Sequence, residues 1–531
     1  MDEVQGYLSL HLHAHLPFVR HPEYEEFLEE DWLYEAISET YLPLLDVFDR
    51  ATDEGIPFRI SLTMSPPLVA MLRDDLLMGR YARRLERLVE LADREVHRTR
   101  NDPTFNGLAH HYRHEFGRLR HLFEDRYKRD LVGAFRRLED AGRLELATCG
   151  ATHGFLPLLQ QFPEAIRAQI EVAATSHRRH FGRNPTGIWL PECGYFPGLD
   201  PFLAEQDIRW FFVDTHGLTD ATPRPRYGVY APVYTPTGPA AFARDPESSM
   251  QVWSAESGYP GDPAYREFYR DVGWDLDWSY VRDFIQPNGQ RKNVGIKYFR
   301  ITGKTPQKEP YDPVRARERV AQHAGNFMFN RERQIENLAA RMDGVRPIVV
   351  SPYDAELYGH WWYEGPAFID FLIRKVAFDQ KVFRLATPGE YLREHPEQQL
   401  CTPPMCSWGA GGYAGVWLDA SNDWIYRHVH KATGLMIAIA RDYAEPTHLE
   451  RRALNQAARE VLLAQSSDWA FIMKTGTMVD YAVRRTREHV LRFTRLHDQV
   501  RSGQIDAGWL GWVEAKDNIF PEIDYRVYAP R

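Results

Sequence analysis

Hydrophobic and polar positions alternate near the start of the chain, in the manner of a strand with two different faces. In residues 7–15, leucines at every second position share one face, while a serine and three histidines share the other. Short apolar runs of strand type, most of them separated by segments with helical periodicity, return at 58–64, 144–148, 187–190, 210–213, 251–254 and 348–350. This repetition predicts an α/β fold built on a parallel, barrel-like sheet.

Three longer stretches depart from this rhythm. Residues 68 to about 143 have helical periodicity with dense pairing of arginine and glutamate, which is too long for one barrel helix and predicts a helical insertion. Residues 219–261 are rich in proline, glycine and tyrosine, and we expect them to form a loop over the active site. We predict a catalytic barrel over 1–395 and a mainly helical C-terminal domain over 396–531 that contributes to the site.

Composition narrows the class of protein. Of the 531 residues, 44% are hydrophobic and 26% are charged, as in soluble globular proteins, but the 13% of aromatic residues is high and favours surfaces that stack flat ligands such as sugar rings. A net charge of −9 disfavours a nucleic-acid partner. No signal peptide and no apolar run of membrane-spanning length are visible, so we expect a cytoplasmic protein without a membrane partner. Four cysteines without a C-x-x-C pair predict free thiols.

Two carboxylates stand where predicted strands end among aromatic residues. Glu192 follows the run 187–190, and Asp354 follows the run 348–350. Barrel enzymes place their reacting groups at the carboxyl ends of parallel strands, because the loops there meet at one mouth. Glu356 competes with Asp354, since it would share a face with Asp354 in an extended segment. We favour Asp354 because it lies nearer the strand end.

A carboxylate pair ringed by tryptophan and tyrosine is what glycosidic-bond chemistry requires. A competing hypothesis is a zinc-type hydrolase built on His11 and His13, whose further ligands would come from His153, His216, His360 and Asp354. It explains the histidines but leaves Glu192 and the tryptophan-rich loops without a purpose. A carbohydrate-binding protein without catalysis ranks third. Two or three histidines on one face disfavour a purely structural role in the core.

Five segments in this order resemble those of glycoside hydrolase family 57, and within it those of the 1,4-α-glucan branching enzymes. The segments are His11-Leu-His-Ala-His-Leu-Pro, Gly150-Ala-Thr-His-Gly-Phe, Trp189-Leu-Pro-Glu-Cys, Ser351-Pro-Tyr-Asp-Ala-Glu and Ser466-Ser-Asp-Trp. The resemblance implies an incomplete (β/α)7 barrel with a helical insertion and a helical C-terminal domain. It also implies a retaining mechanism that uses no metal and no other cofactor.

The resemblance assigns roles to particular residues. Glu192 takes the position of the nucleophile and Asp354 that of the acid/base, and Tyr234 lies on a mobile loop over the site. Residues in substrate-binding positions are His11, His13, Trp32, His153, Tyr234, Arg266, Arg270, Trp274, Trp408, Trp417 and Asp468, with Arg266 and Arg270 equally suited to contact glucan.

The expected activity follows from this resemblance. It is the cleavage of α-1,4-glucan, such as amylose or a glycogen-like polymer, and transfer of the segment to a 6-hydroxyl group, with α-amylase and 4-α-glucanotransferase as alternatives. Neither composition nor motif predicts the oligomeric state.

Overall fold

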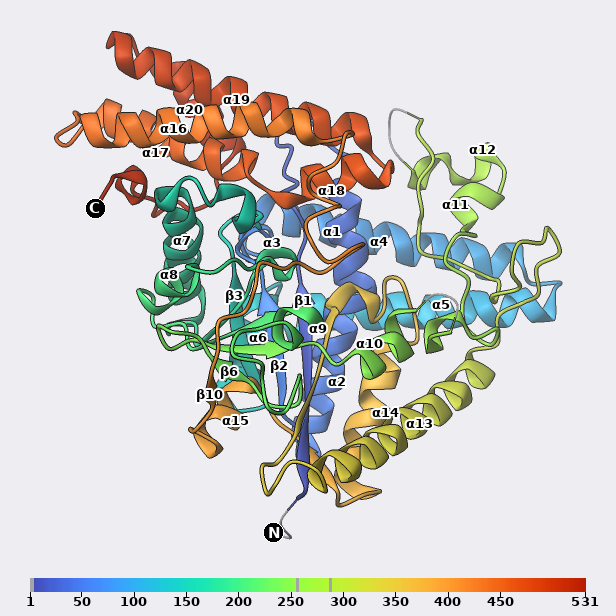
Figure 1. Cartoon of the computed structure of the whole chain (residues 1–531). Coiled ribbons are helices and arrows are strands. Elements are labelled where there is room, and N and C mark those ends of the chain that lie inside the picture. Colours follow the sequence, from blue (N-terminus) through green and yellow to red (C-terminus); the bar gives the residue numbers. More distant parts are fainter. Residues whose placement is uncertain (1–3, 255–256, 286–288) are drawn as a thin grey trace.

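The apolar runs of the sequence assemble into one curled sheet that the helices surround (Figure 1). The structure is a computed structural model that describes residues 4–254, 257–285 and 289–531. Within these ranges, seven strands lie in the order β7-β5-β4-β3-β2-β1-β8 with all neighbours parallel. The strands are β1 (Gly6–Ala14), β2 (Ile60–Met64), β3 (Leu144–Cys149), β4 (Gly187–Trp189), β5 (Trp210–Val213), β6 (Val233–Tyr234), β7 (Ala240–Ala243), β8 (Ile348–Asp354), β9 (Phe383–Leu385) and β10 (Gln399–Leu400).

The sheet curls toward closure but no strand pair joins β8 to β7 in the described part of the chain. Two backbone hydrogen bonds bridge the gap instead, from Asp245 N to Val350 O at 2.8 Å and from Ile348 N to Tyr230 O at 2.9 Å. At the other edge, β6 is antiparallel to β7 and carries β10. The predicted fold class, an incomplete (β/α)7 barrel, is confirmed.

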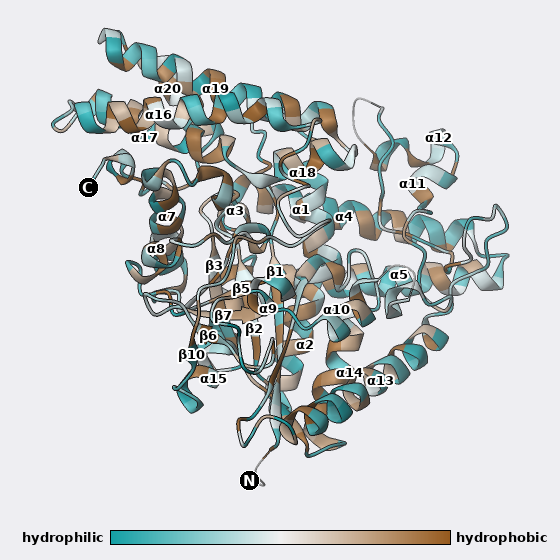
Figure 2. Ribbon diagram, in the orientation of Figure 1, coloured by the Kyte–Doolittle hydropathy of each residue, from teal (hydrophilic) through white to brown (hydrophobic). Residues whose placement is uncertain are grey.

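Bulky aromatic side chains fill the interior of the barrel. Trp189, Trp210 and Phe212 are fully buried there, and the ring of His11 lies 4.5 Å from Phe212 and stacks parallel to Trp189 at 5.5 Å. Figure 2 shows the central strands in the hydrophobic colour and the outward faces of the surrounding helices largely in the hydrophilic one. The interior of the barrel is therefore packed solid, and chemistry is confined to its ends.

Helices occupy the predicted insertion and much of the C-terminal part. Asp312-Pro313 begins a helix, as the sequence predicted, and Asp102-Pro103 begins another in the same way. In both, the aspartate side chain accepts hydrogen bonds from backbone N–H groups of the first turn. The α-helices are α1 (Glu30–Ala36), α2 (Leu42–Asp53), α3 (Pro66–Leu72), α4 (Asp75–Arg98), α5 (Pro103–Arg120), α6 (Leu131–Asp140), α7 (Pro163–Phe181), α8 (Asp200–Ala204), α9 (Thr215–Thr219), α10 (Pro246–Trp253), α11 (Val272–Asp275), α12 (Trp278–Val281), α13 (Pro313–Ala339), α14 (Gly365–Phe378), α15 (Pro388–Glu394), α16 (Tyr426–Asp442), α17 (His448–Ala464), α18 (Ser467–Thr475), α19 (Val479–Ser502) and α20 (Ala507–Lys516). The π-helical turn η1 (Ile37–Tyr41) joins α1 to α2.

The stretch 219–261 is not the continuous loop that we predicted. It supplies strands β6 and β7 to the sheet and then helix α10, while residues 255 and 256 lie outside the described residues. The strand predicted at 251–254 was wrong, since residues 251–253 end α10. The Asp245 side chain accepts a hydrogen bond from Ser248 N and starts this helix at Pro246, which outweighs the strand preference of valine and tryptophan.

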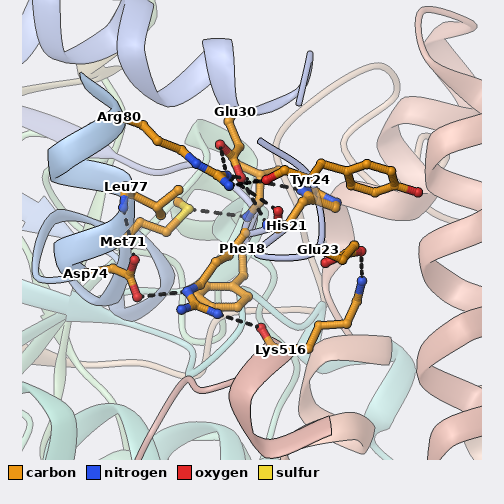
Figure 3. A network of polar contacts seen from close by, with 12 residues as sticks. Phe18, His21, Glu23, Tyr24, Glu30, Met71, Asp74, Leu77, Arg80 and Lys516 are labelled. Atoms are coloured by element: carbon orange, nitrogen blue, oxygen red, sulfur yellow. Dashed lines mark hydrogen bonds and ion pairs between the residues drawn. The ribbon is translucent and has the colours of Figure 1, made fainter. Parts of the chain in front are cut away.

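The segment after β1 ties the first helices to the C-terminal ones (Figure 3). Arg80 on α4 pairs with Glu30 on α1 at 2.7 Å, and Lys516 at the end of α20 pairs with Glu23. Arg20 bonds both Asp74, the N-cap residue of α4, at 2.8 Å and the carbonyl of Ala515 at 2.5 Å. The C-terminal helices thus dock on the barrel, although the predicted division at residue 395 stays a prediction. None of the helices in the described ranges has the length and apolar character needed to cross a bilayer.

Candidate active site

Glu192 lies just past the carboxyl end of β4, as the sequence predicted. Its backbone is in the left-handed region, with φ at 62° and ψ at 26°, and Cys193 follows with φ at 50°. Non-glycine residues hold this conformation at a cost of about 1–3 kcal/mol, so surrounding contacts must maintain it. The strained turn directs the carboxylate of Glu192 toward the loops at the mouth instead of continuing the strand.

The tryptophan-rich segment holds this turn from one side. Tyr195 and Cys406 exchange two backbone hydrogen bonds of 2.9 and 3.0 Å, and Trp408 N donates to the carbonyl of Glu192 at 2.8 Å. This short antiparallel pairing brings the indole of Trp408 over the site. Its Nε1 donates a hydrogen bond to Glu192 Oε2 at 2.7 Å, and the ring packs edge-on against Trp189.

The start of helix α18 holds Glu192 from the other side. Ser467 N donates to the carbonyl of His153 at 2.9 Å, which docks the helix on the loop after β3. The Ser467 hydroxyl then lies 2.9 Å from Glu192 Oε1 and 2.8 Å from His153 Nδ1. Ser467 was missed as a site residue. Its position beside Asp468, in the last of the five segments, was the available signal.

Burial raises the pKa of Glu192 to about 7, against the opposing effect of the hydrogen bonds from Trp408 and Ser467, while Asp468 and Asp354 raise it further. Burial also raises the pKa of Asp354 to about 6, opposed by His15 and Arg244. Burial therefore brings the pKa of both carboxyl groups up toward neutral pH. Two donors favour the charged form of Glu192, whereas no described residue donates a hydrogen bond to the Asp354 carboxylate.

The structure separates Asp354 from its competitor Glu356. Asp354 ends β8 directly beside His13 of β1 in the register of the two strands. Glu356 is buried one turn further on, where its Oε1 accepts hydrogen bonds from the Tyr41 hydroxyl and from His15 N. Glu356 is thus occupied by protein groups, whereas Asp354 keeps its lone pairs for other partners.

Two histidines, His153 and His13, form a hydrogen-bonded chain that Ser467 connects to Glu192. When Glu192 is ionised, Ser467 donates to it, so His153 Nδ1–H must donate to Ser467. His153 Nε2 is then an acceptor, and His13 Nε2–H donates to it across 3.1 Å. Burial lowers the pKa of both rings well below the usual value, in keeping with this neutral arrangement. His13 Nδ1 is left without a hydrogen-bond partner among the described residues.

His15 makes an ion pair with Asp468 above this chain. Its Nε2 lies 3.1 Å from both oxygens of Asp468, its Nδ1 lies 2.8 Å from Ser65 Oγ, and its ring stacks on His153 at 3.8 Å. Burial lowers the pKa of His15, but Asp468 outweighs that effect and leaves it raised. Burial raises the pKa of Asp468, but His15 brings it down to about 2. Of the three histidines that the alternating pattern places on one face, His15 is therefore the one whose pKa is raised.

Two residues that were predicted to contact substrate, His11 and Trp417, are buried in the structure. Both ring nitrogens of His11 bond hydroxyls, to Ser61 and Thr63 at 2.9 Å each, and burial lowers its pKa to about 3, so His11 is a core residue below the site. Trp417 is 1% exposed and stacks on Phe155 at 5.0 Å, so no face of it is open to a sugar. His11 therefore has a purely structural role, which the sequence pattern had disfavoured.

Tyr234 lies at the wrong end of the barrel for a residue above the site. It pairs with Ala240, and Ala240 pairs with Trp210 at the amino-terminal start of β5, whereas Glu192 follows a carboxyl end. Its hydroxyl donates to the carbonyl of Pro396 at 3.1 Å. The antiparallel strand β6, which the sequence did not reveal, carries it there.

The other residues predicted to bind substrate, Trp32, Arg266, Arg270 and Trp274, make no hydrogen bond or ion pair with Glu192 in the described part of the chain. Trp32 is half-buried against the edge of Tyr481 on α19. Arg266 is buried in an ion pair with Glu39 at 2.6 Å, whereas Arg270 pairs with Asp275 near the surface, and Trp274 is exposed. Arg266 and Arg270 thus have different surroundings, although neither pairs with Glu192 or Asp354.

The predicted zinc ligands are only partly brought together. The ligand atoms of His13, Cys149 and His153 lie within 4.8 Å of one another, and so do those of His15, His153 and Asp468. Burial raises the pKa of the Cys149 thiol well above its usual value. His216 bonds the Gly412 carbonyl and His360 pairs with Glu39, so neither belongs to these groups.

Comparison with protein families places this architecture. The model of glycosyl hydrolase family 57 matches residues 9–404, and a model described as the C-terminal part of 1,4-alpha-glucan branching enzyme matches residues 428–528. The chain belongs to glycoside hydrolase family 57. Both carboxylates fall within the first match, and Ser467 and Asp468 fall within the second.

Individual members of the family are similar over nearly the whole chain. A 1,4-alpha-glucan branching enzyme of Thermococcus kodakarensis is 34% identical over 98% of this chain and 78% of its own. The crystal structure of an alpha-amylase of Thermotoga maritima has a TM-score of 0.93 and 47% identity, with 99% of both chains covered. That of a branching enzyme of Pyrococcus horikoshii has a TM-score of 0.89 and 32% identity, covering 99% of this chain and 97% of the other.

Proposed function

We propose that this family 57 protein is a 1,4-α-glucan branching enzyme. The observation that carries the proposal is the continuity of two matches: a family 57 barrel with Glu192 and Asp354 is followed in the same chain by a C-terminal part of branching-enzyme type. That C-terminal part contributes Ser467, which bonds Glu192 directly. The substrate would be an α-1,4-glucan, and a cytoplasmic location and a part in glycogen synthesis belong to the same proposal.

The site supports a retaining double displacement. Ionised Glu192, held by Trp408 and Ser467, attacks the anomeric carbon, while Asp354 gives its proton to the departing glycosidic oxygen. The new bond joins the sugar to Glu192, and the bond to the leaving chain breaks. Asp354 then takes the proton from a 6-hydroxyl of an acceptor chain, whose oxygen displaces Glu192 and closes an α-1,6 linkage. The anomeric configuration is inverted twice and so is retained.

Contacts around the pair support further roles. The His15–Asp468 ion pair and the neutral His13–His153 chain lie next to each other, because the ring of His15 stacks on that of His153, and we assign them to binding the hydroxyls of the reacting sugar. Trp408 both bonds Glu192 and presents a half-buried ring, which suits it to exclude water from the glycosyl intermediate. Transfer in place of hydrolysis depends on that exclusion.

The decisive experiment measures both outcomes of one reaction. The protein is incubated with amylose, and α-1,6 linkages are counted by NMR against new reducing ends. We expect α-1,6 linkages to exceed new reducing ends in the wild-type protein, and both to vanish in Glu192→Gln, which keeps the fold. Reducing ends without branches would instead establish the second candidate, an α-amylase.

The second candidate rests on one specific observation. The Thermotoga maritima structure that bears the name alpha-amylase shares 47% identity with this chain, more than the branching enzyme of Pyrococcus horikoshii with 32%. The same carboxylate pair serves hydrolysis when water replaces the acceptor hydroxyl. The linkage count therefore separates the two candidates, whereas an assay of amylose consumption alone would not.

A further inference from the structure

A cavity of about 620 Å³ lies between helices α2, α4, α5 and α14 and the residues Arg266, Phe268, Asn293, Gly295 and Lys297. Neither Glu192 nor Asp354 lines it. This volume is in the range of sites that hold small ligands, about 300–1,000 Å³. The helical insertion that contributes α4 and α5 forms one wall, so the cavity belongs to a part of the fold that the mechanism above does not use.

Groups of both charge signs line the cavity. Six carboxyl-bearing residues and six arginines or lysines are among its described lining residues. Most are already paired, as Arg266 is with Glu39 at 2.6 Å and Arg118 with Glu115 at 2.8 Å. An anionic ligand would need surplus positive charge, which these pairs do not supply. The guanidinium and carboxylate groups of these ion pairs can still donate and accept hydrogen bonds, which suits a neutral ligand with many hydroxyl groups.

Two lining carboxylates retain unused capacity. Glu364 is 6% exposed, and its Oε2 makes no hydrogen bond to the described residues, while its Oε1 accepts from Arg266 N at 3.0 Å. The nearest cationic atoms to the Glu35 carboxylate, on Arg84 and His360, are 3.9 Å away. Burial raises the pKa of Glu35 to about 7, so near neutral pH this group both donates and accepts. These atoms can bond hydroxyls of a bound molecule.

Aromatic rings supply the second requirement for a sugar. The guanidinium of Arg266 covers one face of the Tyr363 ring at 3.8 Å, and Phe268 packs edge-on against His360 at 5.7 Å, so open ring faces must come from neighbouring residues. Exposed rings adjoin these lining residues: Tyr269 is 80% exposed and contacts Phe268, and Trp361 follows His360 and is 52% exposed. Such amphipathic faces suit the flat sides of pyranose rings.

The π-helical turn η1 connects the cavity with the active site. Glu39 on this turn lines the cavity, and Tyr41 two residues later donates to Glu356 beside the catalytic pair. The loop that carries His360 is packed tightly on this turn, because a Cβ added to Gly359 would come within 1.8 Å of the Glu39 carbonyl. π-Helical turns are frequent at functional sites.

We propose that this cavity is an accessory site for a neutral oligosaccharide, so that the enzyme holds a second stretch of α-glucan outside the cleft of Glu192 and Asp354. The choice of α-glucan rests on the proposed function. The occupied cavity would keep a glucan chain close to the active site, which raises its effective concentration there.

Calorimetry with maltohexaose tests this site in the Glu192→Gln protein, in which turnover is blocked. We expect two binding sites per chain. Ala367→Trp, which fills the cavity from α14, should leave one, and Ala377→Trp, on the same helix but away from the cavity, should leave two. Glu35→Ala removes a carboxylate whose ion pairs with Arg84 and His360 are long, at 3.9 Å, and should weaken the second site at least tenfold without lowering the melting temperature.

One site in all of these proteins, or two sites that Ala367→Trp and Glu35→Ala both leave unchanged, would overturn the proposal. Glucose 6-phosphate is the anionic probe, and binding of it to the cavity in preference to maltohexaose would overturn the neutral class of ligand. The wild-type amylose assay is scored separately. Cleavage without a second site rejects only the accessory site, and a second site without cleavage rejects only the proposed function.

Discussion

The indole nitrogen of Trp408 lies 2.7 Å from a carboxylate oxygen of Glu192, although 216 residues separate the two in the chain. The pairing of residues 406–408 with the turn after β4 creates this contact. In this contact the indole N–H group of Trp408, which stays neutral, donates a hydrogen bond to the buried carboxylate of Glu192, which must be ionised for the reaction. The contact therefore acts on the charge of Glu192 as well as on its position.

Replacing Trp408 by phenylalanine keeps the ring but removes the N–H donor. A hydrogen bond to a charged group contributes about 1.5–3 kcal/mol, so kcat/KM should fall about 10- to 100-fold. Because the bond lowers the pKa of Glu192, its loss should move the acid limb of the pH–rate profile to higher pH. Trp417→Phe is the matched control, since the Trp417 nitrogen has no partner in the described residues. Equal profiles for both variants would contradict the assignment.

Asp354 and Glu356 can be separated by isosteric variants. Asp354→Asn should lower kcat on amylose about 10²- to 10⁴-fold, the usual contribution of a general acid. A substrate with an activated aryl leaving group should recover much of the first step, because it departs without a proton. Glu356→Gln should cost less than about tenfold, since Glu356 is engaged by Tyr41 and His15. The reverse order of the two effects would transfer the acid/base role to Glu356.

The His15–Asp468 pair should stabilise the fold over a limited pH range. The pKa of Asp468 is lowered from 3.8 to about 2, so its contribution is present above pH 3.8 and is lost as the pH falls toward 2. The pKa of His15 is raised, so its contribution is present below pH 6.5 and is lost as the pH rises through the folded value. The expected maximum lies between about pH 4 and 6.5, with a size of about 2 kcal/mol.

Thermal unfolding of Asp468→Asn checks this range. The melting temperature of the variant should be lowest relative to wild type at pH 5, and the difference should shrink at pH 9. Ser466→Ala serves as the control, because it removes the 2.5 Å hydrogen bond to Asp468 but not the ion pair. A difference that stays constant from pH 5 to pH 9 would show that the ion pair does not contribute.

Removal of metal should leave activity unchanged if the carboxylates carry the reaction. We expect zinc analysis of the purified protein to find far less than one ion per chain, and dialysis against a chelator to preserve amylose turnover. The group His13, Cys149 and His153 defines the alternative. One zinc per chain, lost together with activity in Cys149→Ala, would favour the metal-dependent hydrolase.

Tyr234→Ala should leave the ratio of branching to hydrolysis unchanged. Tyr234 lies on β6 at the amino-terminal end of the parallel strands, so it does not shield the glycosyl intermediate. The linkage assay used for the wild-type protein measures this ratio. A rise in hydrolysis would require β6 to move to the other end of the barrel when glucan binds.

Features that depend on neighbouring residues were predicted correctly, whereas features that depend on distant contacts or very short strands were not. The strand before Glu192, helix α7 and the Asp312-Pro313 helix start follow from neighbouring residues, and they match the sequence interpretation. The strand expected at 251–254 failed because a capping aspartate several residues earlier starts a helix through it. The sequence did not predict the antiparallel strand β6, because a strand of two residues has no periodicity to detect.

Local residue patterns suffice to predict the alternation of strands and helices, the position of Glu192 and Asp354 at strand ends, and the family to which the chain belongs. The contacts of those two carboxylates depend on the folded arrangement. His11 and His13 share one strand face, yet Ser61 and Thr63 occupy the first and leave the second to His153. Burial and hydrogen bonds depend on residues that are distant in the chain, and these contacts set the charge on Glu192.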